Sequence, residues 1–121
     1  MEATEKFRYA MSGLSVEDYE AELDQLWAEL KDPNSDLSQE AKSRGIDVGP
    51  LRALERRDAI ALETEEAAFG VEVILIIALA PLATELVKAS APIIKDLWFS
   101  VLRPRILQRK GEDVLSEEKE K

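Results

Sequence analysis

The stretch Phe69-Gly-Val-Glu-Val-Ile-Leu-Ile-Ile-Ala-Leu-Ala-Pro-Leu-Ala-Thr-Glu-Leu-Val87 decides the fold, because it is apolar on every face. Twelve uncharged residues separate Glu72 from Glu85, whereas a helix that spans a bilayer needs about 20 apolar residues. Pro81 also removes a hydrogen bond from any helix that contains it. The stretch therefore predicts a buried helix at the centre of a small, mainly α-helical bundle.

The same region contains residues that favour strands. Residues 58–64 read Asp-Ala-Ile-Ala-Leu-Glu-Thr, and seven residues are too few for periodicity to separate a helix from a strand. An α+β fold with a short strand pair within residues 58–77 is therefore the alternative. The β-branched residues that support it are Val71, Val73, Ile74, Ile76 and Ile77.

Upstream, the spacing of apolar residues predicts a helix over residues 16–31. Ser15 suits its N-cap, and Asp18 is an acid in its first turn. Pro33 disfavours helical geometry in the residue before it, which ends the helix. The buried stripe consists of Val16, Tyr19, Leu23, Leu26, Trp27 and Leu30.

Two shorter helical segments are expected next. Asp36 can cap a helix that extends to about Arg44, with Gly45 as the residue that turns the chain afterwards. Pro50 suits the first position of a further helical turn.

Downstream, Ser90-Ala91-Pro92 is expected to start another helix, which Pro104 ends or bends. The sequence thus predicts a flexible N-terminus over residues 1–13, a single helical domain over 14–110 and a disordered charged tail over 111–121. One side of the last helix carries Ile93, Ile94, Leu97, Trp98, Val101 and Leu102.

The composition excludes several kinds of chemistry. The 121 residues include no cysteine and no histidine, so disulfides, thiolate nucleophiles, imidazole bases and the usual zinc sites are ruled out. No basic segment followed by an apolar one marks a secretion signal. We therefore expect a cytoplasmic protein without cofactor or small-molecule substrate, and not an enzyme.

Charge is distributed unevenly along the chain. The formal net charge is −9, which disfavours binding to nucleic acid. Residues 73–110 nevertheless carry an excess of basic side chains, between two acidic flanks. A local basic patch could therefore still contact an acidic partner.

Two acidic patterns resemble sites but do not meet their requirements. Residues 32–40 resemble the first half of an EF-hand loop, but Leu37 stands where glycine is needed and Ser43 where glutamate is needed. Glu72 and Glu85 would lie roughly 140° apart around one continuous helix, too far to act together. No metal site and no catalytic residues are therefore predicted.

Two groups of residues are candidates for contacts. The first would contact a partner protein through helix faces, as in a coiled-coil seam; it comprises Tyr19, Leu23, Leu26, Trp27, Leu30, Ile94, Leu97, Trp98 and Val101. The second would contact an anionic membrane or an acidic partner; it comprises Trp98, Phe99, Arg103, Arg105, Arg109 and Lys110.

These features favour a non-enzymatic interaction or assembly protein, such as a small bacterial adaptor or a homo-oligomeric component that acts through helix–helix contacts. The alternative is a membrane-active or peripheral membrane protein of the toxin or defence type, which inserts residues 69–102. Glu72, Pro81 and Glu85 count against a stable span in that alternative.

Overall fold

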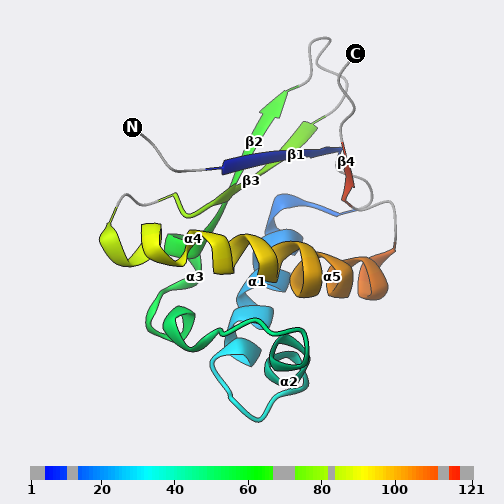
Figure 1. Ribbon diagram of the computed structural model, residues 1–121. Coiled ribbons are helices and arrows are strands. Elements are labelled where there is room, and N and C mark those ends of the chain that lie inside the picture. Colours follow the sequence, from blue (N-terminus) through cyan, green and yellow to red (C-terminus); the bar gives the residue numbers. More distant parts are fainter. Residues whose placement is uncertain (1–4, 11–13, 67–72, 82–83, 112–114, 118–121) are drawn as a thin grey trace.

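The computed structural model describes residues 5–10, 14–66, 73–81, 84–111 and 115–117, and these residues form an α+β fold (Figure 1). Within them, the strands form one antiparallel sheet in the order β2-β3-β1-β4. The strands are β1 (Glu5–Ala10), β2 (Ile60–Glu66), β3 (Val73–Leu79) and β4 (Ser116–Glu117).

The helices cover one face of this sheet. A continuous helical rod, formed by α4, η2 and α5, runs below β1 and β3 in the view of Figure 1, while α1 runs behind the rod and α2 lies at the end farthest from the strands. The helices are α1 (Val16–Leu30), α2 (Asp36–Ser43), the 3-10 helix η1 (Gly49–Ala53), α3 (Arg56–Ala59), α4 (Glu85–Leu97), the π-helix η2 (Trp98–Leu102) and α5 (Arg103–Lys110).

The mainly α-helical bundle is therefore wrong, and so is its central apolar helix, because residues 73–79 form β3. β3 pairs with β1 along one edge and with β2 along the other, and every position from Ile74 to Ala80 is buried, so both of its faces are covered by side chains. A strand buried on both faces reads as a continuous apolar run. The alternative α+β fold agrees with the structure, and its strand pair within residues 58–77 corresponds to β2 and the start of β3.

The N-terminal strand was also not expected. Residues 1–13 were predicted to be flexible, but Glu5–Ala10 pairs with β3 along its whole length. The sequence signal was alternation, because Phe7 and Tyr9 pack toward the core whereas Lys6 and Arg8 are exposed. The sheet thus includes strands on both sides of the helical region that was predicted.

The outer face of the sheet is covered by its own charged side chains. Lys6 of β1 pairs with Glu63 of β2 at 3.4 Å, and Arg8 pairs with Glu65 at 2.5 Å. Both pairs reach across β3, where Ile76 is opposite Arg8 on one side and Glu63 on the other. Ile76 is buried, as expected where long charged side chains lie over an apolar residue.

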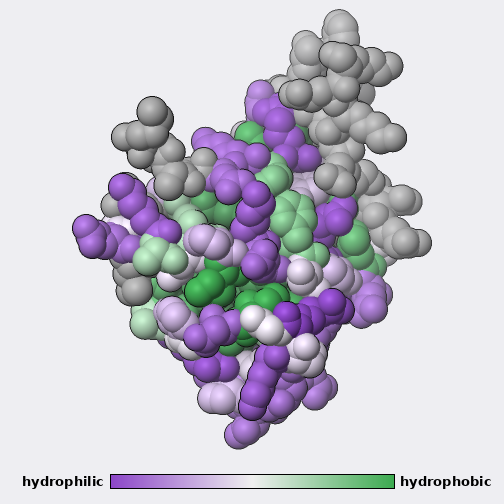
Figure 2. All heavy atoms as spheres, viewed as in Figure 1, coloured by the Kyte–Doolittle hydropathy of each residue, from purple (hydrophilic) through white to green (hydrophobic). Residues whose placement is uncertain are grey.

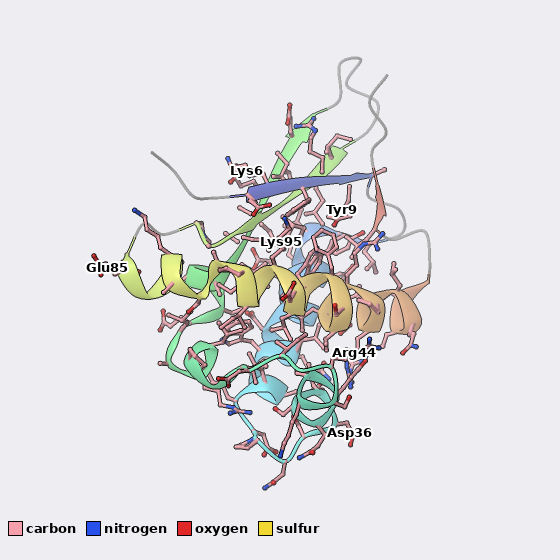
Figure 3. All side chains as sticks on the ribbon, viewed as in Figure 1. Lys6, Tyr9, Asp36, Arg44, Glu85 and Lys95 are labelled. Carbon is pink, nitrogen blue, oxygen red and sulfur yellow. The ribbon has the colours of Figure 1, made fainter. Side chains whose placement is uncertain are left out.

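The core lies between the inner face of the sheet and the helices. Trp98 is completely buried, and its indole Nε1 donates a hydrogen bond to the Tyr9 hydroxyl at 3.1 Å. Figure 3 shows Tyr9 between β1 and the helical rod. Strand β1 is thus fixed to the rod by an aromatic contact as well as by its pairing with β3.

The first two predicted helices are confirmed. α1 spans Val16–Leu30, and α2 spans Asp36–Ser43. The cap of α2 is Ser35, not Asp36, because the Ser35 hydroxyl accepts from the Ser38 backbone N–H. The predicted helical turn at Pro50 is the 3-10 helix η1.

Helix α1 begins with a capping box. The Ser15 hydroxyl accepts from the Asp18 backbone N–H, while the Asp18 carboxylate accepts from the Ser15 backbone N–H. The hydrogen bond to the Ser15 backbone, followed by the contact with its side chain, holds the pKa of Asp18 below its ordinary value. The ionised carboxylate is therefore the form that the folded state prefers.

This lowered pKa predicts a pH dependence. The stabilisation by Asp18 is present above its unfolded-state pKa and is lost as the pH falls through its lower folded-state pKa. Asp18→Asn should therefore be less stable than wild type at about pH 7, and the difference should shrink toward about pH 3. Urea unfolding followed by circular dichroism at both pH values measures this.

Glu17→Gln is the matched control, because Glu17 is in the same first turn but outside the capping box. A difference between Asp18→Asn and wild type that does not change with pH would contradict the prediction.

Candidate functional site

The described residues line a groove beside α2, at the end of the molecule away from the sheet. Its volume is about 550 Å³, within the range of roughly 300–1,000 Å³ that is typical of ligand sites. The surface around α2 is mostly hydrophilic in Figure 2, and Figure 3 shows Asp36 and Arg44 at the ends of this helix. The groove is lined by Pro33, Asn34, Ser38, Gln39, Lys42, Gly45, Ile46, Asp47, Val48, Gly49 and Arg52.

Local hydrogen bonds shape the groove. The buried Ser38 hydroxyl lies 2.7 Å from the Asp32 carbonyl and 3.2 Å from the Leu30 carbonyl, which ties α2 to the end of α1. Gly45 then adopts a left-handed backbone with φ +78°, and Ile46 donates its N–H to the Ala41 carbonyl. This is the helix ending for which glycine is favoured.

The opposite wall follows from the next turn of the chain. The Asp47 carboxylate accepts from the Gly49 backbone N–H at 3.0 Å. Pro50 then occupies the first turn of η1, where its lack of an N–H has no cost. This turn carries Arg52 back toward α2.

Arg52 is held in place by the protein on one side of its guanidinium group. Its Nε donates to the Leu30 carbonyl at 2.9 Å, and its Nη2 lies 3.4 Å from the Ser38 hydroxyl. An arginine has five N–H donors, and Nη1 has no acceptor among the described residues. The side chain is only partly buried, so these free donors are accessible from the groove.

The other polar groups of the groove also keep free hydrogen-bonding capacity. Lys42 forms no ion pair within the part of the chain that the structure describes. Gln39 donates its side-chain amide to the Pro33 carbonyl, which leaves its side-chain oxygen as an acceptor. The groove therefore offers two cations, one carboxylate and neutral amides.

Most other cations are already paired within the chain. Arg56 pairs with Glu20 and Asp24, and Arg105 pairs with Glu40. Arg52 and Lys42 differ from them, because both line the groove and neither forms an ion pair with a carboxylate among the described residues. In a chain of net charge −9, this makes the groove a locally cationic site.

The first predicted contact group lies in the core. Tyr19, Leu23, Leu26, Trp27, Leu30, Ile94, Leu97, Trp98 and Val101 are all buried within the folded chain. Trp27 also donates its indole N–H to the Leu54 carbonyl at 3.0 Å. The periodicity of these residues is thus explained by packing within the chain, and their surfaces are not available to a partner.

The predicted membrane-contact aromatics likewise pack internally. Trp98 contacts Tyr9, and Phe99 forms an edge-to-face contact with Phe7 at 4.9 Å between ring centroids. Among the described residues, no helix has both the length and the apolar character needed to cross a membrane.

The predicted basic cluster faces acidic helices of the same chain. Arg109 contacts Glu22 at 3.0 Å and Glu29 at 3.3 Å, and Lys110 contacts Glu22 at 3.7 Å. Partial burial lowers the pKa of Arg109, but the hydrogen bonds to Glu22 and Glu29 raise it by more, so it lies above its ordinary value. Arg109 is therefore firmly cationic and satisfied within the fold.

Arg103 also makes its contacts within the chain. Its guanidinium carbon lies 5.4 Å from the centre of the Tyr9 ring, and its Nη2 donates to the Leu115 carbonyl at 2.9 Å. The predicted basic group thus serves to join α5 to its neighbours.

The acidic patterns have structural roles where they are described. Asp32 accepts from the Asn34 backbone N–H, and Ser35 caps α2. The described residues contain no group of three or more acidic side chains that could hold a metal ion. Glu72 lies outside the described residues, so the pair Glu72 and Glu85 has no structural test.

Sequence reasoning missed the groove because three separate segments build it. Residues 33–34, α2 and residues 45–52 each contribute. One signal was present in the sequence, since Lys42 and Arg52 flank the turn-forming Gly45 and Pro50. Their lack of a carboxylate partner becomes visible only in three dimensions.

The chain was compared with known proteins, and no protein-family model, curated protein or solved structure matches it. Its function must therefore be argued from the geometry of its own residues.

Proposed function

We propose that this chain is a non-enzymatic interaction protein that docks a segment of another protein in the groove beside α2. The observation that carries the proposal is the guanidinium edge of Arg52, which lines this groove and has no acceptor for its Nη1 among the described residues. A preformed concave site with a few oriented polar groups is the usual form of a binding site.

The fixed positions of the polar side chains in the groove support a binding role. Ser38 is buried and fixed by the ends of α1 and α2, and Arg52 is fixed by Leu30. A partner would thus meet donors that are already oriented, which lowers the entropic cost of association. The groove replaces the helix faces that were predicted as the contact surface.

The absence of cysteine allows a direct test by site-specific cross-linking. Gln39→Cys places a photoreactive label at the groove, and Lys88→Cys places the same label on the exposed surface of α4. In lysate of the source organism, we expect a discrete cross-linked product from Gln39→Cys and none from Lys88→Cys. A product of twice the chain mass would identify a second copy as the partner.

Arg52→Gln in the Gln39→Cys background should reduce this product at least about tenfold, because a charge-assisted hydrogen bond is lost. Arg57→Gln is the matched control, since Arg57 is exposed, does not line the groove and has the same charge. Equal capture by both label positions, or no product from Gln39→Cys, would contradict the proposed function.

A further inference from the structure

We infer that the groove beside α2 recognises a carboxylate side chain in an acidic segment of the partner, with Arg52 as the anchoring residue. This inference rests on the proposed function, because it names the chemistry of the segment that would dock in the groove. It is carried by the hydrogen-bonding geometry of Arg52, the charges around it and the polar lining of the groove.

The guanidinium group has the correct free edge for a carboxylate. Nε is occupied by the Leu30 carbonyl, and one donor of Nη2 is directed to Ser38. Both donors of Nη1 and the second donor of Nη2 remain free of the described residues. Two parallel N–H groups from this edge match the two oxygens of a carboxylate, which is the common bidentate arrangement.

Lys42 reinforces this preference. It lines the same groove from α2, one helical turn beyond Ser38, and has no ion-pair partner among the described residues. An ammonium group acts as a mobile point charge, so it can approach an anion that Arg52 holds. The two residues together favour one negative group.

Asp47 supplies an acceptor for a peptide ligand. It lines the groove, and one of its carboxylate oxygens accepts a hydrogen bond from the Gly49 backbone N–H. Arg52 and Lys42 attract a doubly charged phosphate more strongly than a singly charged carboxylate, and Asp47 repels it more strongly, so charge alone does not select between the two. The carboxylate of Asp47 can, however, accept an N–H from the backbone of a bound peptide.

The amides of the groove suit a peptide backbone as well. The side-chain oxygen of Gln39 is an available acceptor, and the Asn34 side chain makes no hydrogen bond within the described part of the chain. Buried amides of a ligand need such partners, because an unpaired polar group lowers affinity. A short acidic peptide therefore fits the groove better than a compact inorganic anion.

A random peptide library displayed on phage provides an unbiased probe. We expect selection on the wild-type protein to enrich peptides with Asp or Glu at one fixed position, and selection on Arg57→Gln to give the same enrichment. Selection on Arg52→Gln should not enrich that position. Calorimetry on one enriched peptide should show at least about tenfold weaker binding when its acid is changed to the amide.

Two further variants separate chemistry from folding. Arg52→Lys keeps the charge but loses the bidentate edge, so binding of the enriched peptide should weaken several-fold. Lys42→Gln should also weaken it, although Lys42 is exposed and makes no hydrogen bond in the described structure. Thermal unfolding of each variant shows whether the fold is retained.

The outcomes distinguish this inference from the proposed function. Enriched peptides that need Arg52 and Lys42 but have no fixed acidic residue would overturn the carboxylate inference and leave the groove as a docking site. The same holds if inorganic phosphate displaces the peptide more effectively than free glutamate does. Peptides that bind all groove variants equally, or no retained peptide, would overturn both.

Discussion

Trp98→Ala is expected to lower the free energy of unfolding by about 4 kcal/mol. Trp98 has no solvent exposure, and its loss would leave a large cavity between β1 and the helical rod. It would also remove the 3.1 Å hydrogen bond from its indole N–H to the Tyr9 hydroxyl. Since small domains are marginally stable, much of the population should unfold.

Urea unfolding followed by circular dichroism measures this effect. Phe99→Ala is the neighbouring control, and its effect should be smaller because Phe99 is only partly buried. A loss below about 1 kcal/mol for Trp98→Ala would place the indole outside the core and contradict the fold described. Because Trp27 and Trp98 are both buried, the addition of anionic vesicles should not change the tryptophan fluorescence of the wild-type protein.

Arg56→Leu is expected to lower the free energy of unfolding by about 2 kcal/mol, mainly because a buried backbone carbonyl loses its donor. The Arg56 side chain is only 4% exposed, and it joins Glu20 and Asp24 of α1 to the start of β2. Its Nη1 also donates to the Ile60 carbonyl at 3.1 Å, which would lose its donor. The substitution removes several charge-assisted bonds at the junction between helix and sheet.

Thermal or urea unfolding at low and high salt tests this prediction. The loss of stability caused by Arg56→Leu should persist at high salt, because Arg56 is buried. By contrast, salt should screen the attraction between the exposed side chains of Lys6 and Glu63. Arg57→Leu is the matched control, since Arg57 is adjacent but exposed. Equal effects of the two substitutions would show that the buried position of Arg56 contributes nothing.

The helices could be predicted where local signals agree. Ser15 and Pro33 mark the limits of α1, and the apolar residues between them follow the helical period. α2 could be found from its short polar sequence and Gly45 for the same reason. Capping and periodicity are local properties, so one sequence suffices to recognise them.

The sheet was predicted only in part and only as the alternative, because its strands are defined by distant neighbours. β3 has no alternation, since β1 and β2 cover its edges and side chains cover both of its faces. A run of apolar residues is compatible with a buried helix or a buried strand. β1 carried an alternating pattern, but it is stabilised by β3, β4 and the helical rod, which are all distant in the sequence.

The candidate site was hidden for a similar reason. The basic residues of α5 were predicted to contact a membrane or an acidic partner, but Arg109 pairs with Glu22, which is 87 positions away in the sequence. Arg52 was not singled out, although its free donors distinguish it in the structure. Which cations are paired depends on tertiary contacts and cannot be read from local composition.

The contact between Tyr9 and Trp98 also bears on how the chain is synthesised. These residues are 89 positions apart, so β1 leaves the ribosome long before the helical rod that covers it. Until then, Phe7 and Tyr9 have no rod to pack against, and β1 has no sheet partner until β3 has emerged. Contacts this distant make folding slower than local ones do. A nascent chain that stalls before Trp98 should therefore expose its first strand to chaperones or proteases.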